Sequence, residues 1–193
     1  MHESSKAVAR RLHTPGFATH YFAGAGLDVG SGGDSLGKVA RLFPLVTSVT
    51  DFDRPDGDAQ FLAKHPDGAF DFVHSSHCLE HIRDPAVALR NWCRVVRPGG
   101  HLVVLVPDED LYEQGVWPST FNADHKHTFT IHKAASWSPV SVNLTTLFAK
   151  VADAAVPLRV EQLHTTFVPG LGRVDQTLTP VGECDIEFVR RRL

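Results

Sequence analysis

A run of glycines between an apolar segment and a helical pattern is the feature that most limits how this chain can fold. Residues 26–37 read GLDVGSGGDSLG, and the apolar residues 25–29 have the character of a buried strand. In residues 36–43 apolar side chains recur at helical spacing, which predicts a helix after the turn. Such a strand-turn-helix unit is typical of a ligand site, because the glycines admit a ligand to the backbone and the helix begins with free N–H groups.

Strands and helices alternate through the first half of the chain. Apolar, β-branched segments predict four strands, at residues 25–29, 45–50, 70–75 and 101–106. A short amphipathic helix is predicted at residues 6–12, and Asp84 and Pro85 predict the cap and first turn of a helix that Pro98 and the two following glycines end. This order predicts an α/β fold with a doubly wound, Rossmann-like, mostly parallel sheet and a ligand crevice at the carboxyl ends of its strands.

The second half of the chain has a looser pattern. Residues 108–133 show no clear period, and we expect an inserted loop region over the acceptor side of the crevice. A helix is predicted to begin at Ser138, and residues 158–167 and 185–191 predict an antiparallel C-terminal strand pair at the sheet edge. A chain of 193 residues with 42% hydrophobic residues is enough for one domain, so residues 1–193 are predicted to form a single domain.

Charge and cysteine content exclude several classes of protein. The formal net charge of −3 provides no basic field for nucleic acid. Three widely spaced cysteines suit reduced thiols better than a disulfide framework. The first residues, MHESSKAVARRLH, lack the apolar core of a signal peptide, and no run of 18 apolar residues occurs. We therefore expect a cytoplasmic protein that binds neither nucleic acid nor membrane.

The glycine turn differs from a dinucleotide-binding turn in its charge. Asp34 stands where a dinucleotide fingerprint has its third glycine, and Asp28 lies close by in the sequence. Two carboxylates disfavour a pyrophosphate but suit a cofactor with ammonium and hydroxyl groups. At the end of the second strand Asp51 is predicted to accept hydrogen bonds from ribose hydroxyls, with Asp53 as the competing candidate.

The chain resembles the class I S-adenosylmethionine-dependent methyltransferases, in a shortened, type 11-like form. The resemblance rests on GLDVGSGGDSLG, VTSVTDFD, GDAQFL, FDFVHSSHCLEHIRDPAVALRNWCRVVRPGGHLVVLVP and ECDIEFVRRRL, in this order. It implies S-adenosylmethionine as cofactor and methyl transfer (EC 2.1.1.-) as activity. By resemblance, the cofactor-binding residues are Asp28, Gly30, Ser31 and Gly32 at the methionine moiety, Asp51 at the ribose, Asp58 and Ala59 at the adenine, and Ser76 and His77 at the sulfonium side.

The chain departs from the family between its second and third strands. Only four residues separate Asp53 from Asp58, where the family normally has a helix and the start of another strand. This shortening puts the adenine contact in question. It also leaves that side of the sheet open to a partner or a second subunit, so a homodimer is one expectation.

The stretch HCLEH, residues 77–81, matches the H-x-x-E-H pattern of some zinc peptidases. A peptidase would carry it within a long helix, whereas here a strand ends just before it. We therefore expect a strand-to-helix corner without a metal ion, in which His81 holds a backbone group and Glu80 is a solvated or capping carboxylate.

The residues that act on the methyl acceptor are expected in the region after residue 107. Asp124, His125 and His127 form a cluster in which His125 or His127 would act as a catalytic base, or hold a divalent metal with Asp124, or be plain loop residues. The predicted acceptor is an O or N atom of a small molecule or a sugar-like compound. The alternatives are a nicotinamide-dependent Rossmann oxidoreductase and a methyltransferase-fold protein that binds without catalysis.

Overall fold

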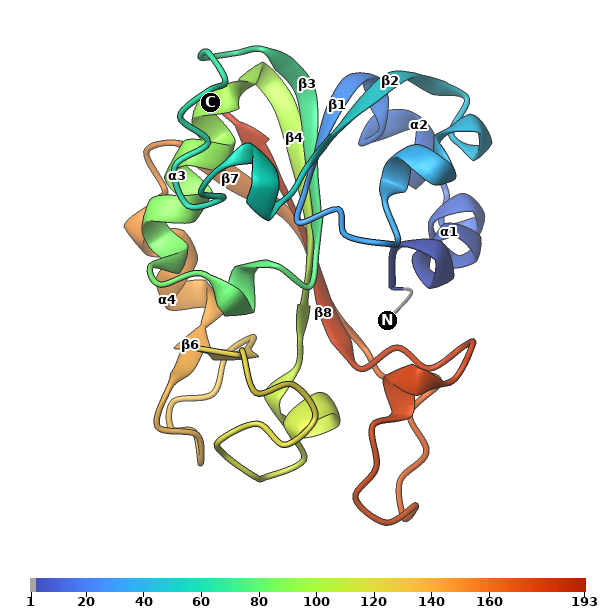
Figure 1. Cartoon of the computed structure of the whole chain (residues 1–193), viewed down its shortest axis with the longest axis vertical. Coiled ribbons are helices and arrows are strands. Elements are labelled where there is room, and N and C mark those ends of the chain that lie inside the picture. Colours follow the sequence, from blue (N-terminus) through green and yellow to red (C-terminus); the bar gives the residue numbers. More distant parts are fainter. Residues whose placement is uncertain (1–2) are drawn as a thin grey trace.

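A six-stranded sheet with the order β2-β1-β3-β4-β8-β7 forms the centre of the computed structural model, which describes residues 3–193 (Figure 1). Parallel pairing joins β2, β1, β3 and β4, and β8 pairs antiparallel with both β4 and β7. The predicted doubly wound sheet with an antiparallel C-terminal pair is therefore confirmed. The strands are β1 Ala23–Val29, β2 Leu45–Phe52, β3 Phe70–Ser76, β4 Val96–Pro107, β7 Ala155–Leu163 and β8 Asp185–Arg192.

Helices cover both faces of this sheet (Figure 1). One face carries α1 (Glu3–His13) and α2 (Phe17–His20), and the other carries α3 (Pro85–Val95) and α4 (Leu144–Lys150). The side chain of Asp84 accepts hydrogen bonds from the first N–H groups of α3, as its sequence predicts. Trp92 of α3 is fully buried in the larger of two hydrophobic clusters, so α3 fixes the apolar face of the sheet beside the site.

The helix predicted for residues 36–43 is replaced by two single turns of 3₁₀-helix. These turns are η1 (Leu36–Lys38) and η2 (Ala40–Leu42). The N–H of Leu36 donates to the side chain of Asp28, and Pro44 follows the second turn. A segment this short, fixed at its start and stopped by proline, has too few residues for a stable α-helix.

Residues 108–143 lie at the end of the sheet where β3 and β4 finish (Figure 1). This region holds a π-helical turn, η5 (Glu109–Glu113), and a two-stranded sheet of β5 (Thr128–Thr130) and β6 (Ser141–Asn143). The predicted helix from Ser138 therefore begins later, at Leu144, because residues 141–143 pair with β5. The long β7–β8 connection projects from the same end of the sheet.

The sheet ends at β2 because the chain turns back immediately after this strand. Asp53 caps a single turn, η3 (Arg54–Asp56), in a capping box with Asp56, and residues 57–69 return to β3 without a further strand. The shortening predicted between Asp53 and Asp58 is thus a turn that leaves β2 as an edge strand. Within residues 3–193, no helix combines the length and apolar character needed to cross a bilayer.

A buried polar chain fastens α1 to the sheet. The guanidinium of Arg11, fully buried, donates from Nε to Glu187 of β8 at 2.8 Å and from Nη1 to Nε2 of His74 at 3.1 Å. Since the arginine can only donate, His74 accepts at Nε2 and donates from Nδ1 to Asp28 at 2.6 Å. Burial alone would raise the pKa of Glu187, but Arg11 and Arg10 outweigh burial and lower it.

The substitution Glu187→Ala should lower the free energy of unfolding by about 3–5 kcal/mol, because it leaves a buried guanidinium without its carboxylate. Arg90→Ala is the control, since it removes an exposed ion pair with Asp153 and should leave stability nearly unchanged. Urea denaturation of both variants measures the difference. Equal, small effects would show that Arg11 does not depend on Glu187 for its burial.

Candidate active site

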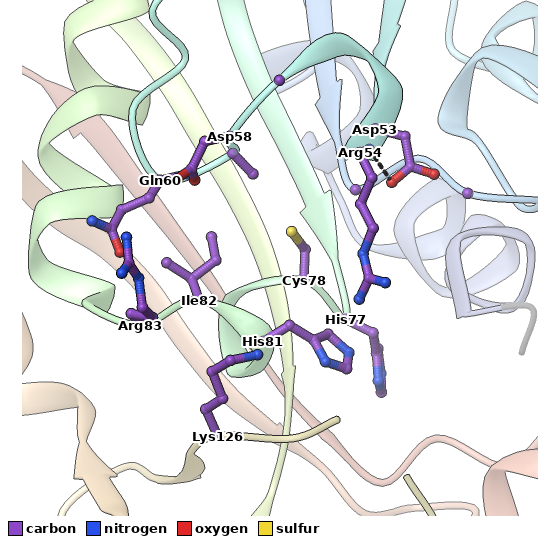
Figure 2. A pocket seen from close by; sticks show the side chains of 14 residues that line it. Asp53, Arg54, Asp58, Gln60, His77, Cys78, His81, Ile82, Arg83 and Lys126 are labelled. Atoms are coloured by element: carbon purple, nitrogen blue, oxygen red, sulfur yellow. Dashed lines mark hydrogen bonds between the residues drawn. The ribbon is translucent and has the colours of Figure 1, made fainter. Parts of the chain in front are cut away.

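A cavity of about 500 Å³ opens at the carboxyl ends of β1, β2 and β3 (Figure 2). The residues that follow these strands line it, with Gly30 after β1, Asp53 after β2 and His77 after β3. Figure 2 shows Asp53 and Arg54 on the right, Asp58 and Gln60 on the left, and His81 and His77 below them. The volume lies within the range of about 300–1,000 Å³ usual for small-ligand sites.

Gly30 shapes the wall of this cavity because no larger residue fits there. Its φ of 75° is a left-handed conformation, and an added Cβ would lie 2.5 Å from Cβ of Cys78. Gly32 also has a positive φ, of 47°. The turn therefore brings backbone rather than side chains to the cavity surface.

A second hollow, of about 250 Å³, continues the first beyond the glycine turn. The two share Gly30, Gly32, His77 and His81, and the second adds polar residues at its far end. These added residues are Glu3, Ser4, Ser31, Gly33, Asp34, Ser76 and Asn122. Asp34 also accepts hydrogen bonds from the N–H and hydroxyl of Ser5, so this carboxylate joins the glycine turn to α1.

Two of the acids predicted to bind the cofactor do not line either cavity. Asp28 is buried beneath the turn, where its side chain accepts hydrogen bonds from His74 and the N–H of Leu36. Asp51 of β2 lies beside Asp28 of the neighbouring strand β1 and accepts a hydrogen bond from the Ser35 hydroxyl. The acid that lines the cavity after β2 is Asp53, because it lies beyond the end of the strand.

The predicted adenine-side residues lie in the cavity despite the shortened connection. Asp58 and Ala59 both line it. The Ala59 carbonyl accepts from the Trp92 indole at 2.8 Å, and the Gln60 amide oxygen accepts from the N–H of Asp84 at 3.0 Å. Helix α3 and its cap residue therefore fix this segment by hydrogen bonds, although the strand that the family normally has here is missing.

The HCLEH stretch forms a corner, as predicted, and not a long helix. Only one 3₁₀ turn, η4 (Leu79–His81), follows β3 before Asp84 caps α3. The Nδ1 of His81 lies 3.1 Å from the backbone carbonyl of Asp124, so the backbone contact predicted for His81 is confirmed. The prediction for Glu80 is wrong, because its side chain is fully buried and neither carboxylate oxygen has a hydrogen-bond partner.

The two histidines predicted to be catalytic have different surroundings. His125 is buried, its Nδ1 lies 2.8 Å from Glu113, and its Nε2 points toward Glu80. The Nε2 of His127 lies 3.2 Å from the carbonyl oxygen of Arg83, and His127 lines neither cavity. The structure thus brings His125, but not His127, to the region beneath the cavities.

His77 is surrounded by carboxylates. Its Nε2 lies 2.9 Å from Asp185 and its Nδ1 3.6 Å from Glu80. Burial by itself lowers the pKa of His77, but Asp185, Glu80 and Glu3 outweigh burial and raise it to about 9. Burial and the neighbouring Asp185 raise the pKa of Glu3 to about 7. This end of the site therefore carries a concentration of buried acidic groups.

Sequence reasoning missed three cations that line the cavity, Arg54, Arg83 and Lys126. Arg54 is the second residue after the end of β2, and this position could have indicated it. Lys126 comes from the insertion, where no periodic pattern indicates which side chains face inward. Arg54 also forms an exposed ion pair with Asp124 at 2.6 Å, which joins the β2 end of the site to the insertion.

Comparison with known proteins decides the family. A family profile described as a methyltransferase domain matches residues 6–138, more than half of the chain. The chain belongs to this methyltransferase family. The predicted class I methyltransferase fold and the predicted cofactor, S-adenosylmethionine, are thereby confirmed.

Curated relatives match over short segments. Ajmaline N-methyltransferase of Rauvolfia serpentina is 44% identical over 41 residues, 21% of this chain and 14% of that protein. Ubiquinone biosynthesis O-methyltransferase of Xanthomonas oryzae pv. oryzae is 40% identical over 67 residues, 35% of this chain and 28% of that protein. The matches thus span less than a third of either relative.

A solved structure agrees with the fold over almost the whole chain. A SAM-dependent methyltransferase from Archaeoglobus fulgidus has a TM-score of 0.63 at 16% identity, covering 99% of this chain and 94% of that one. At this identity the likeness concerns the fold alone.

The substitution Gly30→Ala should lower the stability of the methyltransferase domain, whereas Gly33→Ala should leave it nearly unchanged. The first change forces a side chain into a left-handed conformation against Cys78 and should cost about 1–3 kcal/mol of unfolding free energy. The second adds a methyl group with no heavy atom within 4 Å, so stability should change little. Chemical denaturation without ligand compares the two, and equal stabilities would contradict the tight packing at Gly30.

Proposed function

We propose that this domain transfers a methyl group from S-adenosylmethionine to an oxygen or nitrogen atom of a small-molecule acceptor. The observation that carries the proposal is the pair of adjoining hollows that share Gly30, Gly32, His77 and His81, of which the first is also lined by Asp53, Asp58 and Ala59. The first has the size and polarity for the nucleoside. The second is a smaller, polar space at the sulfonium side.

The residues present fit the cofactor. We assign Asp53, instead of Asp51, to the ribose hydroxyls, because a carboxylate accepts two hydrogen bonds and Asp53 lines the cavity. Asp58 and Ala59 face the adenine, and the backbone of Gly30, Ser31 and Gly32 faces the methionine moiety. Asp28 supports this turn from beneath without touching the cofactor.

The chemistry supplied by the cofactor is an electrophilic methyl group on a sulfonium. The chain's task is to align an acceptor lone pair with that group and to exclude competing water. Ser76, His77 and His81 occupy the place where an acceptor would approach, at the end of β3. Asp185, Glu80 and Glu3 surround His77 and, outweighing burial, raise its pKa to about 9. His77 is therefore better suited to hold a polar acceptor than to act as a general base.

A nicotinamide-dependent oxidoreductase fits the site less well. The turn is followed by two short 3₁₀ turns and no α-helix, which offers little helix dipole to a pyrophosphate. Asp34 faces the second hollow, where a pyrophosphate would meet its carboxylate. A binding protein without catalysis remains the alternative that acceptor screening tests.

The ribose assignment predicts that Asp53→Asn weakens S-adenosylhomocysteine binding by about 1–3 kcal/mol, because it removes a charge-assisted hydrogen-bond acceptor. Asn keeps the cap of η3, so the change isolates the charge. Asp51→Asn is the matched control and should have the smaller effect. Isothermal titration calorimetry of all three proteins makes the comparison, and a larger loss in Asp51→Asn would restore the assignment made from sequence.

Acceptor transfer is measured separately, as S-adenosylhomocysteine formation with panels of small hydroxylated and amine compounds. Turnover with one class supports the proposed transfer. Tight cofactor binding without turnover on any acceptor, protein acceptors included, would favour a binding protein, and preferential binding of NADH would overturn the proposal.

A further inference from the structure

Glu80 is unlike the other buried glutamates of the chain. Glu109 accepts hydrogen bonds from Thr128, Lys133, Ser136 and Ser141, and Glu187 is paired with two arginines. Glu80 is equally buried, yet neither of its carboxylate oxygens has a hydrogen-bond partner among the described residues. A buried carboxylate without any compensating group is strongly unfavourable.

Histidine ring nitrogens surround this carboxylate at distances too long for hydrogen bonds. Oε1 of Glu80 lies 3.6 Å from Nδ1 of His77, 3.7 Å from Nε2 of His81 and 3.9 Å from Nε2 of His125. Hydrogen bonds from a ring N–H to oxygen are about 2.7–3.2 Å long. Two ligands that each lie about 2.1 Å from a tetrahedral zinc ion are about 3.4 Å apart, so the side chains need to move together by only a few tenths of an ångström to share an ion.

The hydrogen bonds of both rings direct lone pairs toward Glu80. Nδ1 of His125 lies 2.8 Å from the Glu113 carboxylate, and Nδ1 of His81 lies 3.1 Å from the Asp124 carbonyl. Each acceptor takes the ring proton at Nδ1, which leaves Nε2 as a lone pair. Metal-ligating histidines are usually held in this way, with the ring nitrogen that faces away from the metal donating to a carboxylate or a backbone carbonyl.

We propose that Glu80, His81 and His125 bind a divalent transition-metal ion of the zinc class. The ligand atoms of these three residues lie within 4.8 Å of one another. One carboxylate and two imidazoles favour Zn²⁺, or Co²⁺, Ni²⁺ or Fe²⁺, over the oxygen-seeking Mg²⁺ and Ca²⁺. The ion would supply the direct partner that both Glu80 carboxylate oxygens lack.

The proposed ion would have an open side toward the site. His81 lines both hollows, whereas Glu80 and His125 lie behind it in the interior. Three protein ligands and an open position are typical of catalytic rather than structural zinc sites. In the reaction proposed above, on which this step rests, the open position would receive an oxygen of the acceptor and so favour hydroxylated acceptors.

The test is a metal titration of the full chain after removal of bound metal with a chelator. Zn²⁺ is titrated by calorimetry, and Co²⁺ is followed by its visible absorption, which reports nitrogen and oxygen ligation. We expect one equivalent per chain, at least tenfold weaker binding in Glu80→Gln and His125→Gln, and unchanged binding in the control His127→Gln. Glu113→Gln, which touches no ion, should weaken binding by about 10–100-fold through the orientation of His125.

Circular dichroism establishes which variants fold, and if Glu80→Gln does not, His125→Gln and Glu113→Gln decide. Absence of stoichiometric binding by the unaltered chain would overturn the proposal. So would binding that the site variants do not weaken, since the ion would then sit on other histidines. These outcomes do not depend on cofactor binding, so calorimetry with S-adenosylhomocysteine can succeed or fail independently of the metal result.

Discussion

The buried carboxylate of Asp28 is the contact on which the geometry of the site depends. It lies at the end of β1, accepts hydrogen bonds from His74 of β3 and from the N–H of Leu36 beyond the glycine turn, and so fixes both ends of that turn. Through His74 and Arg11 the same chain of hydrogen bonds reaches Glu187 on β8 and the N-terminal helix. Hydrogen bonds thus link the cavity wall to strands from the beginning, middle and end of the sequence. No α-helix follows the glycine turn, so its backbone faces the cavity without a helix dipole.

Most of the sheet and α3 could be predicted from local sequence, because their apolar periods and caps act within a few residues. The helix expected at residues 36–43 could not be excluded locally, since what shortens it is the contact of Leu36 with a carboxylate eight positions earlier and the proline that follows. For the same reason the sequence could not show that Asp28, which it predicts to contact the cofactor, is buried beneath the turn. Its partner His74 is 46 residues away, and no sequence pattern shows that a motif acid faces the interior.

The region around HCLEH shows where sequence spacing is insufficient. The pattern places His77, Glu80 and His81 near one another, but Glu80 is buried only because the insertion closes over it, with the N–H groups of Lys126 and His127 donating to its carbonyl. These contacts bring His125 to the same point. A weak motif at one position and an aperiodic loop some 45 residues later become a single cluster only through the path of the chain after β4.

An exposed ion pair joins Arg54, which lines the larger cavity, to Asp124 of the insertion, and this pair contributes little stabilising energy. Arg54 is 83% exposed and Asp124 about half exposed, so water and salt screen the attraction between them. The end of β2 and the insertion are therefore joined at this point by a contact that ordinary thermal motion can break and remake. Because residues beneath it such as Cys78 and Leu79 are buried, the site combines a buried floor with a surface contact whose loss would change the stability of the fold little.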